Sequence, residues 1–337
     1  MSKYIYGIHD DTTADLLAKV GGSVVMVDAI DHGNESSGRD FRYLADKGLT
    51  VIGNLRHGYG DGHSGNIPLP EHYNAFAMRF ANYVASSQGC TLWVMGNEPN
   101  HAAERPEGQP ITPEMFATCY GKVVTAVKRI AGDRHKVLLG AVAPWNNQTA
   151  YPGNERGDWI TYLSDTILAS PVEIAGCALH VYTHGLEPWR FEIDNPMDEP
   201  FKDRQYDWGV LEEFMVAIDE SIPGAIVYIT ETNPGAGPNK YWPMYNSGWV
   251  QNMYDAVDDQ NVMAARHGFT PVRGACLYRG HPHADIWCYS DKPGTMEDFR
   301  VATEEYQVWD YSEEQPPTPT CVCPHCGKPI ILTKGAE

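Results

Sequence analysis

The amino-acid sequence predicts a closed (β/α)8 barrel, the TIM-barrel fold. Three observations lead to this fold class: eight short apolar runs recur along the chain, a longer stretch with helical spacing follows each run, and the runs are almost continuously apolar. Such alternation of apolar strands and helices is typical of a parallel sheet that helices cover. With eight units, closure into a barrel is the natural arrangement.

Each predicted strand is rich in Val, Ile, Leu and Ala and ends at polar, Gly or Pro residues, as buried strands usually do. The eight strands are predicted at Tyr4–His9, Ser23–Ala29, Thr50–Leu55, Leu92–Gly96, Val137–Val142, Ile174–Val181, Ala225–Thr230 and Val272–Tyr278.

The helices are predicted from apolar residues at helical spacing. They cover Ala14–Val20, Gly38–Lys47, Pro70–Val84, Thr112–Ile130, Trp159–Leu168, Tyr206–Ile218, Ser247–His267 and Met296–Trp309. Thr112 and Pro113 occupy the positions of a helix cap and a first helical residue, which strengthens that assignment.

A doubly wound open sheet is the alternative fold. It is disfavoured because no Gly-x-Gly-x-x-Gly turn follows the first strand, whereas Gly21 and Gly22 precede the second strand, as a helix stop would. The predicted barrel domain covers residues 1–311, which is somewhat above the about 250 residues typical of the fold and leaves room for long loops.

Composition limits the partners of this chain. Its 44 acidic and 25 basic residues give a net charge of −19, which repels nucleic acid and anionic membranes, so neither is expected as a partner. No stretch has the length and apolar content of a signal peptide or a membrane helix. The five cysteines before the C-terminal tail are scattered, which indicates no disulfide framework and predicts a reducing, cytoplasmic or otherwise intracellular location.

The C-terminal tail differs sharply from the barrel. A Pro-rich linker is predicted over residues 312–320, and a Cys-rich segment follows over 321–337. Within it, Cys321, Cys323 and Cys326 resemble one knuckle of a zinc ribbon, which is half of a four-ligand site. The tail therefore either binds a structural zinc completed by a second copy or another partner, or is a truncated remnant that binds nothing.

Functional residues of (β/α)8 barrels gather at the carboxyl ends of the strands. Here the fourth strand leads to Asn97 and Glu98, the sixth to His180 and Tyr182, and the seventh to Glu231. Two carboxylates from opposite strands would thus meet at one rim of the barrel.

The Asn-Glu-Pro after strand four and the Thr-Glu at strand seven resemble those of the clan A retaining glycoside hydrolases, the "four/seven" barrels, over residues 4 to about 310. The resemblance implies that Glu98 is the general acid/base, Glu231 is the nucleophile and Asn97 holds the sugar 2-hydroxyl. His180 and Tyr182 are similar to the clan's His and Tyr on strand six, where the Tyr usually contacts the nucleophile. The implied substrate is a carbohydrate, and the clan's catalysis needs no cofactor.

A retaining mechanism requires two carboxyl groups about 5–5.5 Å apart, one protonated and one ionised. An apolar pocket and a neighbouring anion would raise the pKa of the acid, and Trp93 and Met95 are expected to surround Glu98 in this way. Hydrogen bonds from Tyr182, a histidine or an arginine would keep Glu231 ionised.

The sequence departs from the clan at two places. No arginine follows strand two, so Arg56 or Arg279 is expected to replace it, and Tyr278 with the nearby Trp287 stands where the clan has a Trp on strand eight. The substrate-binding residues expected are Asn97, His180, Tyr182, Trp145, Arg56, Tyr278 and Trp287. Loop aromatic residues that are candidates to stack on sugars, several of them expected to be packing residues, are Tyr59, Trp145, Trp189, Tyr241, Trp242 and Trp287.

Two other functions stay open at this point. Asp10, Asp11, Asp28, Asp31 and His32 at the ends of strands one and two would suit a metal-dependent hydrolase. A barrel without catalysis that binds carbohydrate or protein, and self-associates through the cysteine tail, is the other alternative.

Overall fold

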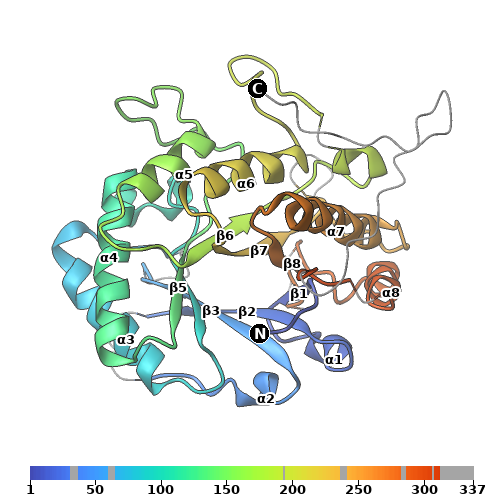
Figure 1. The fold of residues 1–337 in the computed structure, drawn as a ribbon, viewed down its shortest axis with the longest axis horizontal. Coiled ribbons are helices and arrows are strands. Elements are labelled where there is room, and N and C mark those ends of the chain that lie inside the picture. Colours follow the sequence, from blue (N-terminus) through green and yellow to red (C-terminus); the bar gives the residue numbers. More distant parts are fainter. Residues whose placement is uncertain are drawn as a thin grey trace.

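The protein folds as the closed parallel barrel that its sequence predicts. The computed structural model describes residues 1–30, 37–59, 65–192, 194–235, 241–281, 286–305 and 307–311. Eight strands pair in the order β1 to β8, β8 closes onto β1, and the helices surround them (Figure 1). The predicted linker and the predicted zinc ligands Cys321, Cys323 and Cys326 lie outside the described residues.

Every predicted strand is present, with ends that differ by a few residues. The strands are β1 Tyr6–His9, β2 Gly22–Ala29, β3 Leu49–Arg56, β4 Leu92–Met95, β5 Lys136–Leu139, β6 Gly176–His180, β7 Ile226–Thr232 and β8 Val272–Leu277. The largest difference is at β5, which ends at Leu139 rather than Val142 because it pairs with β6 only at Leu139 and Cys177.

The helices also follow the prediction, except at some ends. They are α1 Ala14–Leu17, α2 Arg42–Ala45, α3 Tyr73–Ser86, α4 Pro113–Ile130, α5 Trp159–Leu168, α6 Gly209–Ser221, α7 Trp249–His267 and α8 Pro293–Ala302, with 3-10 turns η1 Pro70–His72, η2 Ala102–Glu104, η3 Pro106–Gly108 and η4 Pro188–Phe191. As predicted, the Thr112 hydroxyl accepts a hydrogen bond from the amide of Met115 and caps α4.

Two helices begin or end differently for reasons visible in the backbone. Asp207 has a φ of 52°, a left-handed conformation that a helix excludes, so α6 starts at Gly209 and not at Tyr206. The last helix ends at Ala302 and not at Trp309, because the chain there pairs with the N-terminus: the Trp309 amide donates to the Lys3 carbonyl.

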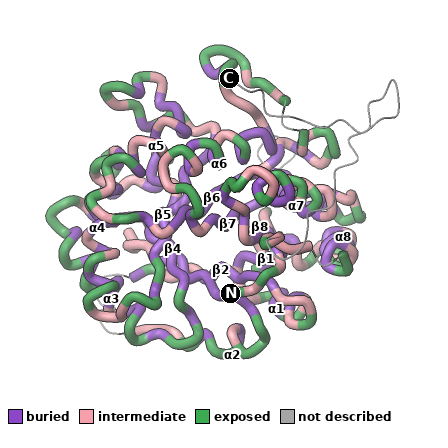
Figure 2. Tube along the Cα trace, viewed as in Figure 1, coloured by how far each residue is buried: buried purple, intermediate pink, exposed green. Residues whose placement is uncertain are grey.

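The core has two layers, as strand alternation requires. In Figure 2 the strands are mostly buried, whereas the surrounding helices carry both buried and exposed residues. The residues packed inside the barrel are, from the strands, Val25, Ile52, Leu92, Val94, Leu138, Ala178, Tyr228 and Cys276, and, just after β5, Ala141. Trp93 and Met95 point the other way, into the layer between strands and helices. The expectation that Trp93 and Met95 surround Glu98 is therefore wrong: the Trp93 indole N–H donates to His135 Nδ1 at 3.1 Å, in that outer layer.

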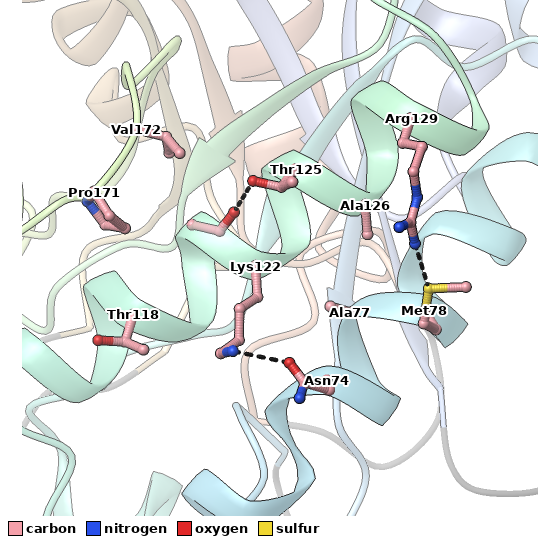
Figure 3. Close-up of a pocket in the computed structure, with 11 residues that line it drawn as sticks. Asn74, Ala77, Met78, Thr118, Lys122, Thr125, Ala126, Arg129, Pro171 and Val172 are labelled. Atoms are coloured by element: carbon pink, nitrogen blue, oxygen red, sulfur yellow. Dashed lines mark hydrogen bonds between the residues drawn. The ribbon is translucent and has the colours of Figure 1, made fainter.

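The five cysteines of the described part are buried and unpaired, in agreement with the absence of a predicted disulfide framework. None of the helices described is long and apolar enough to cross a membrane. A pocket between α3 and α4 (Figure 3) is lined by residues such as Asn74, Lys122 and Pro171. It lies among the outer helices rather than at the ends of the strands.

Candidate active site

Glu98 is presented by a bend at the end of β4. Gly96 and Glu98 both have positive φ, 76° and 40°, and the Glu98 amide donates to the Ala141 carbonyl at 2.8 Å. A Cβ on Gly96 would lie 2.3 Å from Asn66 Oδ1, so this position requires glycine. A non-glycine residue in the left-handed region is strained, and such strain is concentrated at functional sites.

Asn97 is fixed by the same loop. Its amide donates to Asn66 Oδ1 at 3.2 Å, and the Asn66 side chain donates back to the Asn97 carbonyl. Within the described residues, the buried Asn97 Oδ1 has no hydrogen-bond partner. It is an acceptor available to a hydroxyl group.

His180 and Tyr182 extend from β6 toward both glutamates. They lie two residues apart, so in extended backbone their side chains share one face. His180 Nδ1 is 2.7 Å from Glu98 Oε1, and the Tyr182 hydroxyl donates to Glu231 Oε2 at 3.0 Å. The Tyr182 hydroxyl is also 3.2 Å from His180 Nδ1. One continuous set of contacts therefore joins the two carboxyl groups.

Three nitrogen atoms surround the other oxygen of Glu231. Measured to Glu231 Oε1, His180 Nε2 lies at 3.6 Å, His9 Nε2 at 3.7 Å and Arg56 Nη2 at 3.8 Å. All three distances exceed those of a hydrogen bond. Glu231 is thus anchored through Oε2 while Oε1 stays unbonded within the described part of the chain.

Of the two arginines expected to replace the clan's missing one, Arg56 is the one beside Glu231. Its Nε also donates to Asn54 Oδ1 at 3.2 Å, which holds the guanidinium at the rim. Arg279 lies with its guanidinium carbon 5.5 Å from the centre of the Tyr278 ring.

His9 is a residue of this site that the sequence reasoning did not select. It ends β1, and its ring packs edge-on against Tyr278 with centroids 4.8 Å apart. The sequence feature that could have identified His9 is its position as a polar residue at the end of a predicted strand. Most of the other site residues have the same kind of position.

The charges of the site influence one another strongly. Burial raises the pKa of Glu98, but the hydrogen bond and charge of His180 outweigh it and lower that pKa overall. Burial and the nearby Glu98 raise the pKa of Glu231 despite His180. The pKa of His180 is depressed by burial but raised overall by the two glutamates. His180 and Glu98 thus shift each other's pKa in the directions that favour a charged pair.

The aromatic residues expected in the site lie at different places around it. Tyr278 contacts His9, as described above. The Trp287 ring covers Gly235 after β7, where a Cβ would come within 2.3 Å of it. Trp145 is held through its indole N–H by the Gln205 carbonyl at 2.9 Å and lies beside His184, with centroids 4.6 Å apart.

The other candidates for sugar stacking divide between packing and surface positions. Trp242 is buried and donates to the Tyr278 carbonyl, so it packs the rim and offers no face to a sugar. The Tyr59 hydroxyl donates to the carbonyls of Ile67 and Glu104. Trp189 and Tyr241 are exposed.

The carboxylates considered for a metal do not gather in the described part of the chain. Asp28 accepts hydrogen bonds from Tyr83 and Arg39, Asp11 accepts one from Tyr43, and Asp10 accepts one from the amide of Thr12. No group of three His, Cys, Asp or Glu residues suited to a metal occurs among the described residues. The two remaining members of that set, Asp31 and His32, lie outside them.

Comparison with known proteins shows the fold. No family model matches the sequence, and no curated protein matches it. Among solved structures, this chain is similar to a GH128 (subgroup I) endo-β-1,3-glucanase from Amycolatopsis mediterranei in complex with laminaripentaose, with 13% identity and a TM-score of 0.50 over 89% of this chain and 99% of that one.

Two further structures give the same result. A GH128 (subgroup VII) oligosaccharide-binding protein from Trichoderma gamsii has 9% identity and a TM-score of 0.51, with 90% of this chain and 95% of that one covered. A GH family 44 endoglucanase from Clostridium thermocellum has 12% identity and a TM-score of 0.52, with 90% of this chain and 75% of that one covered. At these identities the similarity establishes a shared barrel fold.

Proposed function

We propose that this protein is a retaining β-glycoside hydrolase that cleaves a neutral oligo- or polysaccharide, with Glu98 as general acid/base and Glu231 as nucleophile. The observation that carries the proposal is the set of contacts from Glu98 through His180 and Tyr182 to Glu231. It supports the proposal because a double displacement needs two carboxyl groups at one glycosidic bond.

Glu231 is suited to attack. Tyr182 holds Oε2, so the unbonded Oε1 is the atom that would form the bond to the anomeric carbon. Burial raises the pKa of Glu231, and His180 and Arg56, 3.6 and 3.8 Å away, act against it in favour of the ionised form that attack requires.

Glu98 would receive its proton from His180. His180 Nδ1 lies 2.7 Å from Glu98 Oε1, and the opposite pKa shifts of the two groups favour the proton on the imidazole. Transfer along this bond protonates Glu98 and neutralises His180, so the net charge of the site does not change. Glu98 then donates the proton to the leaving oxygen, and later removes one from the water that releases the sugar.

The substrate class follows from chemistry and from the neighbours. Both Glu98 and Glu231 face the place where the sugar would lie, so an acidic sugar would meet like charges there. Two of the structural neighbours are an endo-β-1,3-glucanase and an endoglucanase, which makes neutral β-glucans the first substrates to test.

The decisive experiment combines turnover with chemical rescue. Wild type is screened against a panel of β-glucans and chromogenic glycosides that includes 2,4-dinitrophenyl β-laminaribioside and β-cellobioside. Glu231→Ala should abolish turnover, and azide should restore the activity of Glu98→Ala on an activated glycoside with retention in the glycosyl azide. If both variants keep wild-type activity, the assignment is wrong. Rescue of Glu231→Ala with retention in the glycosyl azide, together with rescue of Glu98→Ala with inversion, would exchange the two roles.

A second candidate is a carbohydrate-binding barrel without catalysis. One observation favours it: His180 stabilises Glu98 in its ionised form, which cannot donate a proton. One structural neighbour is an oligosaccharide-binding protein. Saturable binding of laminarin by wild type, with no reducing ends released in prolonged incubation, would support this candidate over the enzyme.

A further inference from the structure

His9 is a buried polar side chain of the site that has no role in the reaction proposed above. It is 5% exposed, and neither of its ring nitrogens has a hydrogen-bond partner within the described part of the chain. Buried polar atoms are normally paired, because leaving them unpaired costs free energy. An unpaired imidazole at the mouth of the barrel therefore indicates a partner that is supplied from outside the chain.

The position of the ring identifies where that partner would lie. Tyr278 packs against the ring edge-on and sets its direction, so that Nε2 lies 3.7 Å from Glu231 Oε1. This distance is too long for a hydrogen bond, yet it places Nε2 beside the oxygen proposed to attack the sugar. A sugar ring bound for attack by Glu231 would lie within reach of His9.

The charge of the ring restricts the kind of partner. Burial, with Arg56 next in importance, lowers the pKa of His9 well below its ordinary value, so the imidazole is neutral at neutral pH. A neutral imidazole offers one donor and one acceptor, whereas a charged one offers two donors. A hydroxyl group can both donate and accept, so it can pair with either nitrogen.

We propose that His9 is a substrate-binding residue that holds a hydroxyl group of the sugar attacked by Glu231. The role rests on the proposed glycosidase function. It adds a third strand, β1, to the β4 and β7 that supply the carboxyl groups. His9 would thereby set which sugar ring, and in which orientation, reaches Oε1.

The test uses two substitutions in the full-length protein. His9→Phe keeps a flat ring against Tyr278 but removes both nitrogens, and His9→Gln returns one donor and one acceptor. His135→Phe is the matched control, since His135 precedes β5 at the opposite end of the barrel. The probe is whichever of 2,4-dinitrophenyl β-laminaribioside or β-cellobioside wild type hydrolyses, together with its mono-deoxy analogues in the ring that is attacked.

The expected loss in kcat/KM for His9→Phe is about 10-fold, the effect of one neutral hydrogen bond. His9→Gln should recover much of it, and His135→Phe should match wild type. For one mono-deoxy analogue, wild type should lose a similar factor and His9→Phe nothing more, because the two changes remove the same hydrogen bond. A merely structural role would instead lower the rates on all analogues alike.

Three outcomes distinguish a failure of the proposed role of His9 from a failure of the proposed glycosidase function. If His9→Phe stays within 2-fold of wild type, or if its loss adds to that of every deoxy analogue, the role of His9 is refuted while the glycosidase stands. If His9→Phe fails to fold, His9→Gln with the deoxy series decides in the same way. If wild type hydrolyses no member of the panel of β-glucans and chromogenic glycosides, the proposed function fails and the role of His9 fails with it.

Discussion

Replacing Tyr182 with Phe should move the acid side of the pH–activity profile to higher pH. The Tyr182 hydroxyl donates a 3.0 Å hydrogen bond to Glu231 Oε2, and this bond favours the ionised carboxylate. Without it, the pKa of Glu231, already raised mainly by burial, rises further. As the pH falls, Glu231 is then protonated sooner, and the proposed nucleophile is lost at a higher pH than in wild type.

The size of the shift follows from the bond. A hydrogen bond to a charged group contributes about 1.5–3 kcal/mol, and one pKa unit corresponds to about 1.4 kcal/mol. The acid limb of kcat/KM should therefore move up by about 1–2 pH units. Below that limb, each pH unit of displacement corresponds to about a 10-fold loss relative to wild type at the same pH.

The assay is kcat/KM for an aryl β-glycoside between pH 3 and 9, with wild type measured in parallel. Tyr83→Phe is the matched control, because Tyr83 also donates its hydroxyl to a carboxylate, Asp28, but outside the set of contacts around Glu231. Its acid limb should coincide with that of wild type. An unmoved limb in Tyr182→Phe, or a shift to lower pH, would refute the reasoning.

Three further predictions concern stability, the rim and the tail. Asp158→Ala should lower the free energy of unfolding by about 3 kcal/mol in urea titrations, because buried Asp158 caps α5 and pairs with Arg204. Burial raises the pKa of Asp158, but Arg204 lowers it overall. The stabilisation by Asp158 is therefore present above the unfolded pKa of about 3.9 and is lost as the pH falls. A difference in unfolding free energy between wild type and variant that stays constant from pH 2 to 7 would contradict this. Gly235→Ala should displace the Trp287 ring and raise KM for β-glucan oligosaccharides, and unchanged tryptophan fluorescence and KM would contradict this. If the tail binds zinc through a second copy, elemental analysis should find zinc in the wild-type protein and none in a variant whose cysteines in 321–326 are replaced by Ser. Light scattering should then show a dimer for the wild type only. Equal zinc content in both proteins would refute zinc binding by these cysteines.

The fold was predictable because its signal is repeated along the chain. Apolar runs such as Leu92–Met95 have a length and composition that favour strands, and eight of them alternate with helices. The errors in the fold were confined to the ends of helices and strands. Such an end is set by a single backbone angle, as at Asp207 before α6, or by contact with a distant segment, as at Trp309 beyond α8. Periodicity carries no information about either.

The candidate site was predictable only in part. Glu98 and Glu231 stand out because each follows an apolar strand, and strand order places both at one rim. The strand ends also hold His9, yet nothing local distinguishes it from the neighbouring Asp10. Its value as a site residue depends on an unpaired, buried ring, and burial is a property of the closed barrel.

The sequence by itself thus determined the barrel, the order of its strands and the two carboxylates at its rim, because these follow from local composition and counting. Only the tertiary structure decided that Arg56 lies beside Glu231, that His180 bridges the two glutamates, and that Trp93 faces away from them. The physical reason is that charge and hydrogen bonding depend on distances of a few ångströms between residues far apart in the chain. Closure of the barrel sets those distances, and with them the direction in which the pKa of each carboxyl group moves.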